Sequence, residues 1–328
     1  MEKKIKQNTR WVHIAGTNGK GTTCNYIAAG LTGAGYKTGL FTSPHVLCVT
    51  ERISVDGEPI PKERIPDLCE KWFQALWKVA LDYFAECEVD YAVIETGIGG
   101  LLDCTNEINP ILSVITKIGY DHMDILGSTI TEIARHKAGI IKARVPIVTD
   151  PTQFPEAMKV IRETAESKDS ALYIPSEISD NIFEQNKIVA CEALRILGVD
   201  IPAGAVPPLL ARMQKVHDNP TIIVDGAHNY DAIKAVLTMI PPQATVVFGM
   251  LPTKDYDSCI KLLDGYEVVL VNDVNCIDEV ESALETAQKL VGTPYMASAG
   301  ADTIYRVPTI FVCGSLYLAA NVMKLFNS

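Results

Sequence analysis

The sequence of 328 residues lacks the features that mark membrane, secreted and nucleic-acid-binding proteins. No stretch reaches the ~20 apolar residues of a membrane-spanning helix, and no apolar region follows the basic N-terminus as in a secretory signal. Nine cysteines without a C-x-x-C pair predict free thiols in a reducing cytoplasm, not disulfides or a zinc site. The net charge of −11 disfavours a nucleic-acid partner, because phosphate backbones attract basic proteins.

Short apolar runs alternate with helical stretches along most of the chain. Runs such as "DYAVIE" and "ILSVIT" read as strands, and Glu63–Ala85 and Thr129–Ile141 read as helices. This alternation predicts an α/β fold with a parallel sheet covered on both faces. Prolines and glycines interrupt the pattern over residues 198–220, and a second, smaller alternation follows. Two domains are therefore predicted, over 1–205 and 218–328, with a linker at about 206–217.

A glycine-rich turn near the N-terminus, "VHIAGTNGKGTT" (12–23), joins a strand to a helix expected from about Thr22. Its backbone N–H groups can form an anion nest, to which the helix adds its positive end. Lys20 can contact a phosphate, and the Thr22 hydroxyl can bind Mg²⁺. The turn departs from the pattern G-x-x-x-x-G-K-[ST], because Ile14 replaces the first glycine and Gly21 follows the lysine. A plain turn with an exposed lysine is the alternative interpretation.

Further polar residues follow predicted strands, at the sheet edge where open α/β folds bind ligands. They are Ser43, Glu95, His122 with Lys137 downstream, and Asp225 with His228. Ser43 and Glu95 offer the oxygen ligands that Mg²⁺ prefers. For four of these residues a purely structural role stays open as the alternative. Glu95 would then be an exposed carboxylate, His122 a core histidine, Lys137 a solvated lysine and Asp225 part of a plain turn.

Five motifs occur in the order typical of one family: "HIAGTNGKGTT", "TSPH…ERI", "ETGIGG..DCTN", "DHMDILGSTITEIARHKAGIIK" and "DGAHN". In these motifs the chain resembles the folylpolyglutamate synthase/dihydrofolate synthase branch of the Mur ligase superfamily, shortened at the N-terminus. The resemblance implies a P-loop, parallel-sheet ATP-binding domain of the central Mur ligase type, followed by a Rossmann-like amino-acid-binding domain. It also implies an ATP-dependent amide ligase. An acceptor carboxylate takes the γ-phosphate of ATP as an acyl phosphate, and the amine of an amino acid, glutamate in this branch, displaces the phosphate.

The resemblance further implies a role for individual residues in a site between the domains. The catalytic residues would be Lys20, Lys137, His122 and His228. The residues that bind ATP would be Thr17, Asn18, Gly19, Lys20, Gly21, Thr22, Asn186, Arg212 and Asp225. Thr22, Ser43 and Glu95 would bind one Mg²⁺ ion, and His122 would bind a second. Lys137 matches a family lysine that is carbamylated to N6-carboxylysine, whose carboxylate can bind metal or orient the acyl phosphate.

The chain also departs from the family pattern, mostly beside the expected substrate site. Leu101 replaces an arginine, Leu210-Ala211 replaces a Pro-Gly pair before Arg212, and a shorter segment precedes the first strand. Two more positions differ, where Phe183 replaces a glutamine and Tyr230 replaces a proline. From these departures we expect no dihydropteroate-dependent activity and weak use of reduced folates.

The acceptor is therefore open between a folate and another small biosynthetic carboxylate. A nucleotide-binding subunit without ligase turnover is a further alternative. A P-loop GTPase is disfavoured, because "NKIV" (186–189) lacks the aspartate of the base-reading motif N-K-x-D. We expect a cytoplasmic monomer that acts on small molecules.

Overall fold

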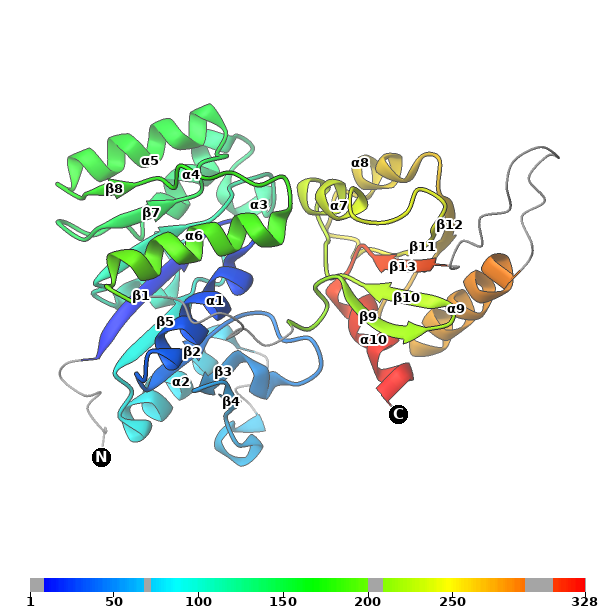
Figure 1. Cartoon of the computed structure of the whole chain (residues 1–328), viewed down its shortest axis with the longest axis horizontal. Helices are drawn as coiled ribbons and strands as arrows, with labels where there is room; N and C mark the ends of the chain where they lie inside the picture. The colour runs from blue at the N-terminus through cyan, green and yellow to red at the C-terminus, as the bar shows by residue number, and fades with distance from the viewer. Residues whose placement is uncertain (1–8, 68–71, 200–208, 293–308, 328) are drawn as a thin grey trace. The chain divides into compact units, whose positions relative to one another are not determined.

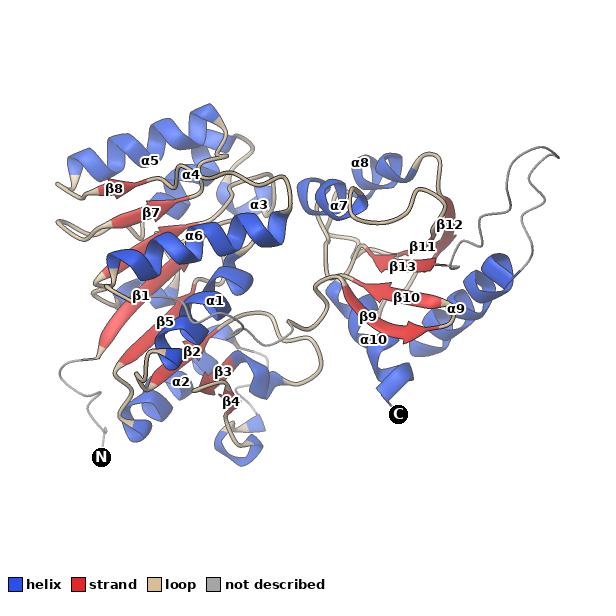
Figure 2. Ribbon diagram, viewed as in Figure 1, coloured by secondary structure: helices blue, strands red, loops and turns tan. Residues whose placement is uncertain are grey.

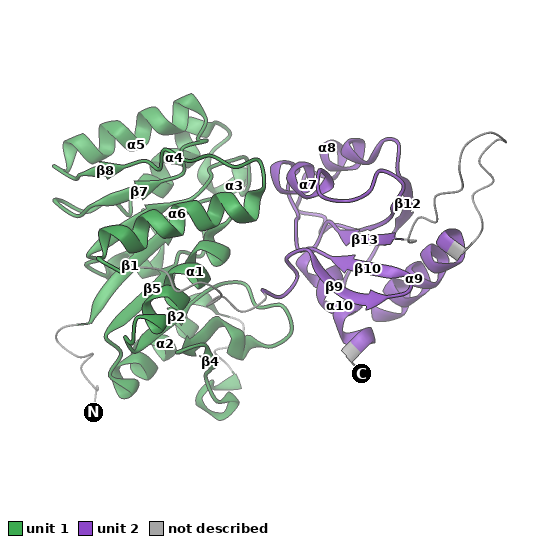
Figure 3. Ribbon diagram, in the orientation of Figure 1, with its two compact units in different colours: residues 1–207 green, residues 208–328 purple. Residues whose placement is uncertain are grey.

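The computed structural model describes residues 9–67, 72–199, 209–292 and 309–327. They divide into two compact units, residues 1–207 and residues 208–328 (Figures 1 and 3). Within the described residues, no helix is long and apolar enough to cross a membrane. The predicted boundary after residue 205 falls outside the described residues. The last part of the predicted linker is not a linker, because Gln214–Asp218 forms a strand of the second sheet.

Unit 1 is built on an eight-stranded sheet in the order β4-β3-β2-β5-β1-β6-β7-β8. Its strands are β1 (Arg10–Ala15), β2 (Thr38–Phe41), β3 (Ile53–Val55), β4 (Glu58–Pro59), β5 (Tyr91–Glu95), β6 (Leu112–Ile115), β7 (Ile147–Thr149) and β8 (Leu172–Tyr173). Within this sheet, strands β2, β5, β1, β6, β7 and β8 pair in parallel, as predicted. At one edge, β3 pairs antiparallel with both β2 and β4. The carboxyl ends of the parallel strands therefore share one edge, where a ligand site is expected.

Helices cover both faces of this sheet (Figure 2). The helices are α1 (Lys20–Gly33), α2 (Phe73–Cys87), α3 (Met123–Leu126), α4 (Ile130–Ala138), α5 (Pro155–Ser167) and α6 (Ile182–Ile196). Successive strand residues point to opposite faces, so Val93 packs with α1 and α6, whereas Ile94 packs with α2. Both residues are fully buried, which explains why β5 reads as a continuous apolar run.

Unit 2 has a smaller five-stranded sheet in the order β12-β11-β13-β10-β9. Its strands are β9 (Gln214–Asp218), β10 (Thr221–Val224), β11 (Thr245–Phe248), β12 (Glu267–Leu270) and β13 (Thr309–Cys313), and its helices are α7 (Tyr230–Leu237), α8 (Tyr256–Ile260), α9 (Ile277–Gly292) and α10 (Leu316–Asn327). All pairs are parallel except β9 with β10. The predicted fold class, two successive α/β units with largely parallel sheets, is confirmed.

Two predicted helices have different bounds in the structure. The helix expected over Glu63–Ala85 begins only at Phe73. Pro66 interrupts its expected first turn, because it restricts the residue before it to an extended backbone, and Ile65 is extended. The helix expected over Thr129–Ile141 is α4, Ile130–Ala138. It begins after a capping box, in which the Thr129 hydroxyl and the Glu132 carboxylate each accept the other residue's backbone N–H.

The packing of β2 against α2 depends on a glycine. A methyl group at Gly39 would lie 2.7–3.1 Å from ring atoms of Phe84, which is fully buried. We expect Gly39→Ala to lower the free energy of unfolding by about 1–3 kcal/mol, as overpacking does. Urea denaturation measures the change, and a stability equal to that of the wild-type protein would contradict this account.

Candidate active site

The glycine-rich turn after β1 is fixed against the end of β6. The backbone N–H groups of Thr17 and Asn18 donate to the carbonyl oxygen of Lys117 at 2.9 and 3.1 Å. A side chain at Gly16 would overlap Thr116, whose Oγ1 would lie 1.8 Å from the new Cβ. The turn therefore needs a glycine where it approaches its neighbouring strand.

The turn ends directly at helix α1, which begins at Lys20 rather than at Thr22. Gly19 precedes it with φ +87°, a backbone conformation that favours glycine. A Cβ at Gly19 would lie 2.0 Å from Oδ1 of Asn186 on α6, so the predicted nucleotide-contacting asparagine lies against the turn. The first N–H groups of α1 have no partners within the helix, and the helix dipole favours an anion beside them.

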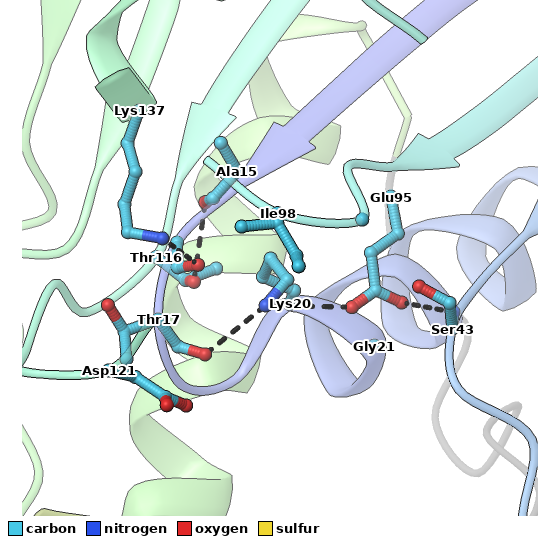
Figure 4. A network of polar contacts seen from close by, with 12 residues as sticks. Ala15, Thr17, Lys20, Gly21, Ser43, Glu95, Ile98, Thr116, Asp121 and Lys137 are labelled. Atoms are coloured by element: carbon cyan, nitrogen blue, oxygen red, sulfur yellow. Dashed lines mark hydrogen bonds and ion pairs between the residues drawn. The ribbon is translucent and has the colours of Figure 1, made fainter. Parts of the chain in front are cut away.

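The carboxylate of Glu95 lies between Lys20 and Ser43 (Figure 4). Its Oε1 is 3.9 Å from the Lys20 Nζ, and its Oε2 accepts the Ser43 backbone N–H at 3.0 Å. The Glu95 side chain is only 3% exposed, so the alternative of an exposed strand-end carboxylate is wrong. Thr22 is buried in the first turn of α1. These carboxylate and hydroxyl oxygens are the donor types that suit Mg²⁺.

Lys137 reaches the same turn from helix α4. Its Nζ donates to the Gly16 carbonyl oxygen at 2.7 Å, and its side chain is only 4% exposed, so the alternative of a solvated lysine is wrong. Burial and then the charge of Lys20 lower the pKa of the Lys137 amine to about 7, although Asp121 opposes this shift. A substantial fraction of the amine is therefore neutral near pH 7.

His122 lies on the loop before α3, not in the core. It has φ +51° and a side chain that is 39% exposed, which makes the alternative of a core histidine wrong. Its backbone N–H donates to Oδ1 of Asp121 at 2.9 Å, and its Nε2 lies 3.9 Å from Oδ2 of the same carboxylate. An adjacent carboxylate of this kind can orient an imidazole.

The predicted metal ligands do not form a protein cage. No group of three His, Cys, Asp or Glu side chains that could bind a metal ion occurs among the residues that the structure describes. A cation at Glu95 would therefore depend on hydroxyl oxygens and on ligands that come with the substrate. This fits Mg²⁺, which usually keeps several waters and shares substrate phosphates with one or two carboxylates.

Asp225 organises the corresponding part of unit 2. It is buried at the end of β10, and its two carboxylate oxygens accept the backbone N–H groups of Met213 and Ala227, each at 2.8 Å. Burial raises the pKa of Asp225, whereas the charge of Arg212 and these two donors oppose the shift. Asp225 is thus more than part of a plain turn, because it ties the residues around Arg212 to the loop after β10.

The loop after β10 also places His228 and explains one departure from the family pattern. His228 Nδ1 lies 2.8 Å from the Gly226 carbonyl oxygen, so Nδ1 carries a proton and Nε2 is the acceptor in the neutral ring. Ala211 accepts the Gly226 N–H at 2.9 Å and has φ +51°. A glycine would adopt this conformation more easily, which gives the usual Pro-Gly pair a physical reason.

The predicted site residues thus form two groups, each within its own unit. Unit 1 contributes Thr17, Asn18, Gly19, Lys20, Gly21, Thr22, Ser43, Glu95, His122, Lys137 and Asn186, and unit 2 contributes Arg212, Asp225 and His228. The sequence analysis missed Lys117 and Thr116, which support the glycine-rich turn through a backbone carbonyl and a close contact. A backbone carbonyl leaves no signal in the sequence.

Comparisons with known proteins show the family and the fold to which the chain is similar. The sequence matches the family models "Mur ligase middle domain" over residues 14–149 and "Mur ligase, glutamate ligase domain" over residues 211–308. It is 31% identical to the folylpolyglutamate synthase of Lacticaseibacillus casei, over 97% of this chain and 90% of that protein. It is 36% identical to the dihydrofolate synthetase of Saccharomyces cerevisiae, over 98% of this chain and 94% of that protein. The structure of Escherichia coli FolC in complex with ADP, without folate substrate, matches with a TM-score of 0.81 at 25% sequence identity. The match covers 98% of this chain and 90% of that one.

The lowered pKa of Lys137 predicts a dependence of stability on pH. Between pH 7 and 10.5 the unfolded chain binds a proton at this lysine that the folded chain has lost, so its contribution to stability rises with pH. We expect Lys137→Met to stabilise the protein by several kcal/mol below pH 7 and by progressively less toward pH 10.5. Urea denaturation of both proteins in CO₂-free buffer measures the difference. A difference that does not change with pH would show that Lys137 is not buried as a titrating amine.

Proposed function

The chain belongs to the folylpolyglutamate synthase branch of the Mur ligase superfamily and is an ATP-dependent acid–amino-acid ligase, and from this premise we propose that it joins glutamate to the carboxylate of a folate-like or related small acid. The reaction passes through an acyl phosphate and releases ADP and phosphate. One observation carries the proposal for this chain. Lys20, the buried Glu95 and the buried Lys137 converge on the glycine-rich turn at the start of α1.

In this proposal the turn binds the phosphates of ATP. The first N–H groups of α1 and the Lys20 ammonium face the negative charge, and Asn186 contacts the nucleotide from beside Gly19. Thr22, Ser43 and Glu95 would bind Mg²⁺, which supplies positive charge to the transferring phosphate. Phosphoryl transfer needs little covalent chemistry from a protein, so these residues act by positioning and by stabilising charge.

Lys137 is proposed to carry a carbamate. Its neutral amine attacks CO₂, a bond forms between Nζ and carbon, and one proton is released. Two features support this step, namely a pKa of about 7, which leaves neutral amine available, and the nearby positive charge of Lys20, which would pair with the new carboxylate. Together with His122, this carboxylate would bind a second Mg²⁺ ion or orient the acyl phosphate.

Unit 2 is proposed to complete the site. Arg212 and Asp225 would act on the nucleotide phosphates, Arg212 directly and Asp225 through the loop that it ties down. His228 would act beside the incoming amine. This role requires the two units to close on ATP, which would exclude water from the acyl phosphate. We further propose that the enzyme works in the cytoplasm as a monomer.

Phosphate release tests the proposed reaction. The full chain is incubated with ATP, Mg²⁺ and glutamate, with tetrahydrofolate, dihydropteroate or an unrelated small acid as acceptor. We expect release that requires both glutamate and one of the acceptors, and an acceptor whose mass grows by one glutamate residue. Nucleotide binding without release for any acceptor would indicate a binding subunit instead. Release with an unrelated acid alone would exclude the folate-like acceptor but keep the ligase.

Lys20→Ala tests the role of the turn. We expect kcat to fall by about 100- to 1,000-fold, the usual loss for one electrostatic donor at a transition state. The variant should stay folded, because the lysine does not contribute to core packing, but loss of its ion pair with the buried Glu95 should lower the melting temperature. Lys159→Ala is the matched control, since Lys159 is an exposed helical lysine paired with Glu163. Near-native phosphate release by Lys20→Ala would reject the phosphate-binding assignment.

Lys137→Ala tests the carbamate. We expect a nearly inactive enzyme that acetate or propionate partly restores, because a free carboxylate can occupy the space of the carbamate. Added carboxylates should not restore Lys20→Ala, since that variant has lost a positive charge and not a carboxylate. Native mass spectrometry of the wild-type protein at raised CO₂ should show the added mass of one CO₂ at Lys137. Absence of both the rescue and the added mass would refute the modification.

A further inference from the structure

His13 is a buried histidine for which the proposed mechanism has no use. It lies in the middle of β1, the strand that leads into the glycine-rich turn, and it is fully buried between β5 and β6. Its Nε2 lies 2.9 Å from Oγ1 of Thr105, which is also fully buried. Burying a histidine in a sheet costs free energy, which its hydrogen bond to Thr105 offsets only in part.

The hydrogen bonds around Thr105 fix the direction of the contact. The Thr105 hydroxyl donates its single proton to Oδ1 of Asp103 at 2.6 Å. It can then only accept from His13, so the imidazole carries a proton on Nε2. The other nitrogen, Nδ1, is buried without a hydrogen-bond partner. In agreement, burial and then the charge of Lys142 lower the pKa of His13 to about 3.

Asp103 links the Thr105 hydroxyl to the backbone of the segment after β5. Its Oδ2 accepts the backbone N–H groups of Gly97 and Ile98 at 2.9 and 3.1 Å. Gly97 is two residues beyond Glu95, the last residue of β5. The chain of contacts from β1 thus ends at the backbone that directly follows the proposed metal ligand.

We propose that His13, Thr105 and Asp103 form a positioning relay, which fixes the Gly97–Ile98 backbone so that the Glu95 carboxylate is held in place for the metal–nucleotide complex. His13 is a positioning residue in this relay and not a catalytic one, because it acts only through Thr105. The inference rests on the metal role proposed above for Glu95. Residues that orient a metal ligand affect metal affinity about 10- to 100-fold when they are changed.

Binding of Mn²⁺ tests the relay without reference to catalysis. Free Mn²⁺ is measured by electron paramagnetic resonance in the presence of a non-hydrolysable ATP analogue. We expect Thr105→Val, which keeps the shape but loses the hydroxyl, to weaken Mn²⁺ binding about tenfold. Thr105→Ser should restore it. Thr149→Val is the matched control, since Thr149 is an equally buried strand threonine whose hydroxyl donates to the Ile115 carbonyl, outside the relay.

Other variants keep the test decisive if Thr105→Val folds poorly. His13→Gln places an amide donor near the position of Nε2 and should bind Mn²⁺ better than His13→Phe. Unchanged binding in both Thr105→Val and His13→Phe would overturn the inference. An equal loss in Thr149→Val would also overturn it. If the wild-type protein binds no Mn²⁺ with the nucleotide, the proposed metal role of Glu95 fails instead.

The imidazole itself gives an independent readout. With ¹⁵N-labelled histidine, the His13 signal is the one that disappears in His13→Gln. It should show the proton on Nε2 and a neutral ring from pH 8 to pH 5, in the wild-type protein and in Asp103→Asn alike. A proton on Nδ1, or a ring that becomes charged above pH 5, would contradict the direction of the relay.

Discussion

The buried carboxylate of Glu95 is the constraint around which the site in unit 1 is arranged. Removing a charge from water costs several kcal/mol unless an opposite charge and hydrogen bonds replace the water. Lys20 and the Ser43 N–H contribute this replacement here. If Lys20 turns toward a phosphate, as the proposed function requires, its attraction for Glu95 weakens. A divalent cation beside the carboxylate would then offset the loss, so nucleotide and metal binding should favour each other.

A second electrostatic constraint concerns Lys20 and Lys137. Both lysines reach the glycine-rich turn, and the charge of Lys20 helps to lower the pKa of Lys137. Two ammonium groups beside the proposed Mg²⁺ ions would oppose metal binding. Loss of the proton from Lys137 removes this repulsion, and addition of CO₂ would convert it into attraction. The low pKa of the buried amine is therefore a condition for the proposed carbamate, and the packing of α4 against the turn supplies it.

Much of this architecture is predictable from the sequence, because strands, glycine-rich turns and strand-end polar residues have local signals. The fold class, the central parallel strands and the convergence of Lys20, Ser43 and Glu95 follow from such signals. Other features depend on contacts between distant residues. The contact between Gly19 and Asn186 joins α1 to α6, and strand β9 forms from residues expected in a linker because they pair with β10. His13 belongs to the first family motif, but its contact has no local signal, since a buried imidazole within a strand can be interpreted only from its distant partner Thr105.

Each half of the proposed site is ordered by contacts within its own unit. In unit 1 the turn is fixed by Lys117 and Asn186. In unit 2 Asp225 binds the N–H groups of Met213, next to Arg212, and of Ala227, next to His228. Neither half needs the other for its local geometry. A ligase must admit its substrates and then exclude water from an acyl phosphate, which requires movement without loss of alignment. Internal ordering of both halves meets the local part of this requirement, because each set of functional groups keeps its arrangement through contacts within its own unit.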